Sequence, residues 1–249
     1  MKHHSIVLQL LFVALALAAL TFSPRLTQSE AEQISPMVSG RPLSAQENEG
    51  KIVAQLKFDP KANGFGFENY GNDHANWEND LNAGDLIKLF GADKVCIEGN
   101  SPDNCVLYET AETWMEKELK EMNDGHCDGM AVVSLRFWQE KEFKGKTHAG
   151  DFQEGAQSLF DLELTPAISN YIAHYFVTQT LDEVYGPGSE TAKKKPSEIL
   201  EMLISSMQDG KTPYTMAFFK TVNGEHKDGH AVTPYGVEEM SEDVDLPDR

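Results

Sequence analysis

Basic residues are scarce in this 249-residue chain, and their scarcity argues against one large class of function. The sequence has 21 Lys plus Arg against 40 Asp plus Glu, which gives a formal net charge of −19. Such a negative field repels phosphate backbones, so we expect no nucleic-acid partner. The one basic cluster, Lys193–Lys195, precedes a proline, and we interpret it as a solvated loop rather than a binding patch.

A hydrophobic run long enough for a typical membrane span is also missing. Ile6–Leu20 is apolar except for Gln9, but it is shorter than the about 20 residues that a spanning helix needs. A short polar start precedes it, as in a secretory signal peptide, and no cysteine follows closely enough for lipid modification. We interpret residues 1–22 as a signal peptide or, because no clear cleavage site follows, as an N-terminal anchor that tethers the chain to a membrane. Either interpretation predicts a secreted or cell-envelope protein.

Cysteine is scarce as well, which makes each of the three cysteines informative in an exported chain. Outside the cytosol, pairs of cysteines tend to oxidise. Cys96 and Cys105 flank a segment rich in Gly, Asn, Ser and Pro, the residues of tight turns. We therefore predict a Cys96–Cys105 disulfide that closes a short loop. Cys127 is left as an unpaired thiol, which calls for an explanation in an exported protein.

The order of the expected elements favours an α+β fold, because helices dominate the first part of the chain and strands the last. Residues 23–50 are polar and show no sustained period, so we interpret them as a linker before a single domain over 51–249. Strands are expected at 52–58, 214–222 and 230–237, and helices at 82–90, 110–122, 165–185 and 196–207, with a further helix that has Cys127 in its first turn and ends near 138. Gly186-Pro187-Gly188 should end the helix over 165–185, and Asp228-Gly229 should form a turn before the last strand.

Cys127 stands where a helix is expected to begin, directly after the break Asn123-Asp124-Gly125. A thiol attacks carbonyls only as the thiolate, and a helix N-terminus or a nearby imidazolium lowers the pKa of a thiol. The backbone amides of such a terminus can also hold an oxyanion. A free cysteine is nevertheless more often a small buried hydrophobe, so Cys127 alone does not define a site.

His230 supplies the second half of a candidate site, because it follows a predicted turn and begins a predicted strand far downstream of Cys127. His126 stands beside the nucleophile, and we interpret it as structural because adjacent side chains usually point apart. His226 and His230 have the H-x-x-x-H spacing of a zinc site that Cys127 would complete, but the turns around them argue against the helix that this needs. We therefore expect no metal and no cofactor.

Two segments, GHCDGMA at residues 125–131 and DGHAVTPY at residues 228–235, resemble the paired motifs of a group of bacterial papain-like cysteine peptidases. In that group the first motif supplies the nucleophile and the second the base. Trp114-Met115 and the segment 134–137 also match, so the resemblance spans about 85–238. It implies a papain-like fold, with a helical N-terminal half that carries the nucleophile at a helix start and a β-strand C-terminal part that carries the histidine.

The chain departs from this pattern at two places. A third residue, Asp or Asn, should orient His230 from a later strand, but only Asp243 and Asp245 lie near by position. Three interpretations stay open: a C-terminally truncated sequence, a working Cys–His dyad, or an inactive domain. The resemblance also implies a Gln shortly before the cysteine as oxyanion donor. Asn123 is the candidate here, and its alternative is a helix-ending residue in left-handed conformation.

These features predict an exported cysteine hydrolase, or thiol protease, that cleaves peptide or amide bonds through a thioester acyl-enzyme. Cys127 would be the nucleophile and His230 the general base. The expected partner is a peptide or protein substrate. The alternative, from a different class, is a catalytically inactive papain-like domain that serves as a cell-surface binding module.

Overall fold

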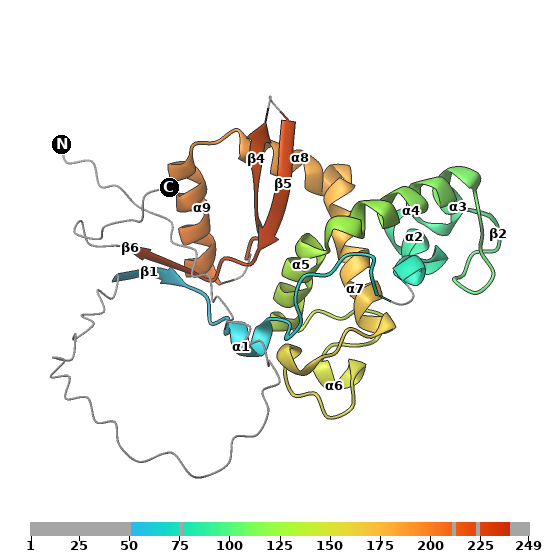
Figure 1. Ribbon diagram of the computed structural model, residues 1–249, viewed down its shortest axis with the longest axis horizontal. Coiled ribbons are helices and arrows are strands. Elements are labelled where there is room, and N and C mark those ends of the chain that lie inside the picture. The colour runs from blue at the N-terminus through green and yellow to red at the C-terminus, as the bar shows by residue number, and fades with distance from the viewer. Residues whose placement is uncertain (1–50, 75–76, 211–212, 223–224, 240–249) are drawn as a thin grey trace, which may run out of the picture. The chain divides into compact units, whose positions relative to one another are not determined.

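The computed structural model describes residues 51–74, 77–210, 213–222 and 225–239 (Figure 1). The chain divides into two compact units, and the larger one, Val53–Gly236, contains every residue discussed below as part of the site. The expected signal peptide or anchor (1–22), the linker (23–50), the Asn223-Gly224 turn and the Asp243 and Asp245 candidates lie outside the described residues. Within the described part of the chain, no helix is both long and apolar enough to span a membrane.

The described elements combine many helices with small two-stranded sheets, as the α+β prediction requires. Strand β2 pairs with β3 and β4 with β5, both antiparallel, and β1 pairs with β6. The helices are α1 (Pro60–Asn63), α2 (Ala83–Phe90), α3 (Ala92–Val95), α4 (Glu109–Glu121), α5 (Cys127–Trp138), α6 (Ala149–Phe152), α7 (Pro166–Phe176), α8 (Asp182–Ala192) and α9 (Pro196–Asp209). The strands are β1 (Lys51–Gln55), β2 (Cys96–Glu98), β3 (Val106–Leu107), β4 (Met216–Val222), β5 (Glu225–Val232) and β6 (Gly236–Glu239).

Helices α5 and α7 pack against each other and carry much of the apolar core (Figure 1). Their close approach depends on Gly129, because a Cβ there would lie 2.2 Å from the carbonyl oxygen of Ile172. Val133 of α5 and Ile172 of α7 are fully buried in the same cluster, which also contains Tyr70 and Phe143. Burial of such side chains stabilises the fold by about 1.5–3 kcal/mol each, so this pair of helices is a rigid support for residues at the start of α5.

Helix boundaries with clear capping residues lie where the sequence predicted them. Asn82 caps α2 in a capping box with Asp85, and Thr165 caps α7, with Pro166 at the first helical position. Gly210 ends α9 in left-handed conformation, with φ at 62°. The helix expected to begin at Cys127 is α5.

The prediction of one helix over 165–185 is wrong. Helix α7 ends at Phe176, a 3-10 turn covers Val177–Thr180, and α8 then continues through Gly186-Pro187-Gly188. Within the 3-10 turn, the side chains of Thr178, Gln179 and Thr180 donate hydrogen bonds to nearby backbone carbonyls. Such local bonds compete with the regular helix ladder. The chain therefore breaks at these polar side chains rather than at the glycines and proline.

The prediction of a turn at Asp228-Gly229 and a strand over 230–237 is also wrong in its boundaries. Both residues lie inside β5, where they stand opposite the single residue Phe219 of β4. An extra residue of this kind forms a β-bulge, which bends the strand instead of reversing the chain. The extended run ends at Val232, before Pro234, and β6 begins only at Gly236.

Candidate active site

Cys127 is the first residue of α5, and it is half-buried and not disulfide-bonded. The chain reaches it through a 3-10 turn, Met122–Asp124, and through Gly125, whose φ of 133° strongly favours glycine. The first amides of a helix have no partner within it, and they present partial positive charge to whatever lies at that end. Cys127 therefore lies at the positive end of the α5 dipole.

The loop 69–71 clamps the turn before Cys127. The backbone N–H of His126 donates to Asn69 Oδ1 at 2.8 Å, and a Cβ at Gly125 would lie 2.3 Å from Asn69 Nδ2. On the same side, Gly71 approaches Asn123 so closely that a Cβ would lie 2.1 Å from its carbonyl oxygen. These approaches fix the backbone around Cys127, and they require glycine at both positions.

His126 is wholly buried, which agrees with its interpretation as a structural residue. Its Nδ1 lies 2.7 Å from the carbonyl oxygen of Tyr70, and its ring stacks on the Tyr70 ring with centroids 4.2 Å apart. The ring therefore points into the protein interior. The adjacent Cys127 is partly exposed, as expected for neighbours that point in different directions.

His230 lies inside β5, opposite Phe218 of β4, and its ring meets the Phe218 ring edge to face at 5.7 Å. Strand β5 contacts α5, and just after the strand Thr233 Oγ1 donates to the carbonyl oxygen of Ala131 at 3.2 Å. Two residues further on, Tyr235 stacks on Phe58, which itself packs against Trp138 at the end of α5. The segment after His230 thus contacts α5 at Ala131 and, through Phe58, near Trp138 at its C-terminal end.

Asn123, the predicted oxyanion donor, is exposed in the 3-10 turn before Cys127. Its left-handed alternative is wrong, because the positive φ at this break belongs to Gly125. The structure adds a second amide that the sequence did not reveal. Asn69 is exposed, lies against Gly125 and is oriented through its Oδ1 by the His126 N–H. It comes from a loop far upstream, where only the glycine- and asparagine-rich composition sets it apart.

Asp128, the second residue of α5, carries an unusual carboxyl group next to Cys127. Burial raises the pKa of this carboxyl to about 6. A position in the first helical turn ordinarily favours the carboxylate, so the desolvation by surrounding protein outweighs the helix dipole here. Asp128 can therefore change charge in a mildly acidic environment.

A buried polar network, which the sequence did not reveal, adjoins the turn before Cys127 through His126. It joins Asp80, His74 and His126 to Ser169 and Asn170 of α7. Asn170 Nδ2 contacts both the Asp80 carbonyl oxygen and Asp85 Oδ2, and Asp85 in turn binds His174 and Lys144. Although burial by itself raises the pKa of Asp85, the bond from His174, the charge of Lys144 and the Asn170 amide together hold it below its ordinary value. The only feature of the sequence that indicated this network was the presence of polar residues on the otherwise apolar helix α7.

The described residues hold no group of three or more His, Cys, Asp or Glu side chains arranged to bind a metal ion. The zinc alternative needed a helix at 226–230, but this backbone is strand β5. The side chain of His226 lies outside the described set. A shallow pocket of about 330 Å³ along α9 is lined by three carboxylates and includes neither Cys127 nor His230.

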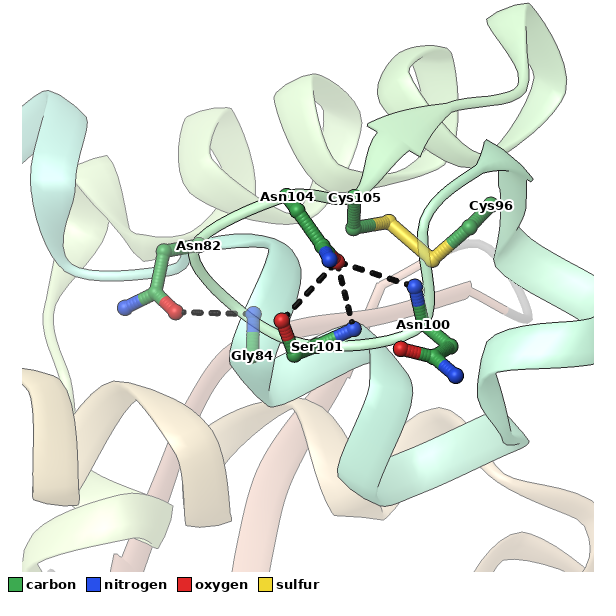
Figure 2. Close-up of a disulfide and its surroundings, with 7 residues drawn as sticks. All are labelled: Asn82, Gly84, Cys96, Asn100, Ser101, Asn104 and Cys105. Carbon is green, nitrogen blue, oxygen red and sulfur yellow. Dashed lines mark hydrogen bonds between the residues drawn. A yellow bond between two sulfur atoms is a disulfide. The ribbon is translucent and has the colours of Figure 1, made fainter.

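The predicted disulfide between Cys96 and Cys105 is confirmed, with Cα atoms 5.3 Å apart (Figure 2). Within its loop, Asn104 Oδ1 accepts hydrogen bonds from the backbone N–H groups of Asn100 and Ser101 and from the Ser101 hydroxyl (Figure 2). Pro102 packs against Gly84, which ties the loop to α2. Since structural disulfides persist mainly outside the cytosol, this bond supports an oxidising, extracytoplasmic environment.

Comparison with known proteins gives no match to a family model, to a curated protein or to a solved structure.

Proposed function

We propose that this chain is an exported cysteine hydrolase of papain-like type, in which Cys127 is the nucleophile and His230 its base. His230 takes the thiol proton as the sulfur adds to a carbonyl carbon, and it returns the proton to the leaving amine when the thioester forms. Water then cleaves the thioester and restores the thiol. The resemblance of the two motifs to bacterial papain-like cysteine peptidases supports this reaction, and the disulfide supports export.

One observation carries the proposal: the chain after His230 is bound to the same helix that begins with Cys127. The Thr233 hydroxyl donates to the Ala131 carbonyl oxygen, about one helical turn from Cys127. This hydrogen bond joins residues 102 positions apart in sequence within the first turns of α5. This contact between the two motifs supports the pairing of Cys127 with His230.

The oxyanion in this proposal is held by the backbone N–H of Cys127 together with a side-chain amide. Asn123 is a candidate by its position in the sequence. Asn69 is favoured by its contacts, because the His126 N–H fixes its oxygen and leaves its Nδ2 group against the turn that leads to Cys127. Oriented amides of this kind stabilise the developing negative charge of a tetrahedral intermediate.

The test uses p-nitrophenyl acetate, an acyl donor that makes no demand on substrate specificity. The full chain should release a burst of p-nitrophenol and carry one acetyl group on Cys127, located by peptide mass spectrometry. The Cys127→Ala variant should show neither. Equal release by this variant would mean that hydrolysis does not occur at Cys127, and the proposal would fail.

Matched variants decide whether the side-chain amide of Asn69 or that of Asn123 holds the oxyanion. If Asn69 holds the oxyanion, Asn69→Ala should slow acetylation of Cys127 by roughly 100-fold, whereas Asn123→Ala should leave it nearly unchanged. Asn69→Asp keeps the acceptor for the His126 N–H but loses the donor, so it should be as slow as the alanine variant. The reverse ranking would return the role to Asn123.

A second candidate, a catalytically silent binding module with the same fold, is favoured by the surroundings of His230. The histidine is exposed, and no carboxylate or amide among the described residues is hydrogen-bonded to it. This candidate predicts no acetyl-enzyme with p-nitrophenyl acetate in a correctly folded chain.

A further inference from the structure

Three positively charged side chains gather near the C-terminal end of α5, although the chain as a whole has a net charge of −19. Arg136 belongs to the last turn of α5 and Lys88 to the last turn of α2, whereas Lys144 lies in the tight turn between Phe143 and Lys146. A cation at the end of a helix interacts favourably with the dipole of that helix. This effect explains Lys88 and Arg136 one at a time, but it does not explain why all three cations converge.

The buried ring of Phe143 shows how close the two lysines are. Lys88 Nζ lies 4.5 Å and Lys144 Nζ 5.1 Å from the centroid of this ring. Tyr171 stacks in parallel on the Phe143 ring, with centroids 4.1 Å apart, so it covers one face. Both ammonium groups therefore lie over the opposite face. Burial lowers the pKa of Lys88, and the neighbouring charges of Arg136 and Lys144 lower it further, as expected for cations held near one another.

The acidic groups beside this cluster leave two of its cations without a direct partner. Asp85 binds Lys144 at 3.0 Å, and the exposed Glu142 contributes a second negative charge nearby. Among the described residues, no carboxylate forms an ion pair with Lys88 or with Arg136. Three positive charges thus stand against two negative ones in a chain whose acidic residues greatly outnumber its basic ones.

The guanidinium of Arg136 is held in a fixed orientation. Its Nε donates to the Tyr171 hydroxyl at 3.1 Å, its Nη2 donates to the Glu142 carbonyl oxygen at 2.9 Å, and its plane lies over the Tyr175 ring at 4.3 Å. Within the described part of the chain, Nη1 makes no hydrogen bond. An oriented guanidinium with free N–H groups is suited to bind an oxyanion, because little side-chain entropy is lost when the ligand arrives.

We infer that Lys88, Arg136 and Lys144 form a binding site for a phosphate group, carried by inorganic phosphate or by a small phosphate ester. A phosphate group carries between one and two negative charges at pH 7, which matches the two cations that lack an acidic partner. The net charge of −19 still repels a polyanion, so the site suits an isolated phosphate and not a nucleic acid. Arg136 lies about 13 Å along α5 from Cys127, so this site does not rest on the proposed function.

The test is an NMR titration of the ¹⁵N-labelled full chain with inorganic phosphate, at pH 7 and constant ionic strength. The Nε–H signal of Arg136, assigned by its loss in Arg136→Lys, should move and saturate. Titration with glycerol phosphate then distinguishes the two sources, since tighter binding of the ester would identify a small phosphate ester as the ligand. A shift that does not saturate would overturn the inference. Succinate that binds as tightly as phosphate would overturn the assignment to a phosphate group.

Matched variants separate a built site from general attraction of anions. Lys88→Gln removes an exposed ammonium group that has no ion pair, so the fold should be unaffected and the affinity for phosphate should fall by roughly 10-fold. Lys94→Gln removes the same charge from an exposed position in α3 and should leave the affinity unchanged. Equal losses in both variants would contradict the site.

Cys127→Ala distinguishes this inference from the proposed function. The variant should bind phosphate as the wild type does, because the site contains no part of the first turn of α5. Conversely, Lys88→Gln should keep the acetylation of Cys127 by p-nitrophenyl acetate. Loss of phosphate binding in Cys127→Ala would contradict a separate site, whereas absence of acetylation with intact phosphate binding would reject the proposed function alone.

Discussion

At the scale of single residues, Asp128 offers a sharp test of the surroundings of Cys127. Burial raises the pKa of its carboxyl to about 6, above the value of 3.8 for an exposed carboxyl. The folded state therefore binds the proton more tightly than the unfolded state, and stability should fall as the pH rises from about 4 to about 6. Asp128→Asn should remove this dependence and be more stable than the wild type above pH 6, by on the order of 2 kcal/mol.

Urea unfolding of both proteins at pH 4.5 and pH 7.5 measures the effect of Asp128. Glu121→Gln, an exposed carboxylate before the same turn, is the control and should change neither value appreciably. An Asp128→Asn variant that is less stable than the wild type at pH 7.5 would show that the carboxylate is stabilised in the fold.

The residues of the candidate site differ in how far the sequence could reveal them. Cys127 could be predicted from the sequence, because a helix break precedes it and an apolar run follows it, and together they mark the start of a helix. Asn69 could not be predicted, because it contacts the turn before Cys127 from a loop that no local periodicity describes. Asp80 could not be predicted from the sequence either. An acidic residue in a polar loop normally lies in water, and only the packing of α7 buries it.

At the scale of elements, helix α8 contains a proline that the sequence suggested would end a helix. Pro187 is the sixth residue of α8, where it removes a backbone donor from the ladder, and no residue of this helix is buried. Pro187→Ala should therefore stabilise the protein, by about 1–2 kcal/mol, because the full interior penalty of about 3 kcal/mol is partly offset by greater freedom of the unfolded chain.

Thermal or urea denaturation of Pro187→Ala checks the helix assignment. Pro166→Ala is the matched control, since Pro166 occupies the first position of α7, where a proline is well accommodated. It should give no stabilisation. A Pro187→Ala variant that is destabilised would mean that the segment is a turn in solution, as the sequence alone indicated.

Element boundaries were predictable where a local residue sets them and not where a neighbour does. Thr165 caps α7 with its own side chain, and Pro166 and Gly210 act through their backbone conformations, so the start of α7 and the end of α9 followed from the sequence. The bulge at Asp228-Gly229 exists only because β4 offers one residue opposite two. Without knowledge of that pairing, the same dipeptide is a normal turn signal.

At the scale of the whole molecule, the network around Asp85 links α2, α7 and the loop that carries Lys144. Its contacts hold the pKa of Asp85 below the ordinary value, so its stabilising contribution is complete above the unfolded-state pKa, near 4, and is lost as the pH falls through the folded-state pKa. Asp85→Asn should be less stable than the wild type at pH 7, and the difference should shrink below about pH 4. Urea unfolding across this pH range measures the difference in free energy of unfolding between the two proteins. A difference that stays constant with pH would contradict the pairing of the Asp85 carboxylate.

The α+β class followed from the order of helical and β-rich segments in the sequence. The packing of the individual helices and strands against each other did not. Helical periodicity identifies which face of α5 is apolar, yet not that α7 would cover it or that the segment after β5 would bind beside it. These contacts join residues far apart in the chain, and they depend on packing that a single sequence does not encode in any local pattern.

The most direct measurement is the alkylation of Cys127 by iodoacetamide in the folded full chain at pH about 5.5, where an ordinary thiol is almost wholly protonated. The other two cysteines are paired, so peptide mass spectrometry reads Cys127 alone. Fast labelling that collapses in His230→Ala, but not in an exposed-histidine control such as His148→Ala, is the predicted result. Slow labelling that is equal in all three proteins would show that Cys127 and His230 are not a working pair.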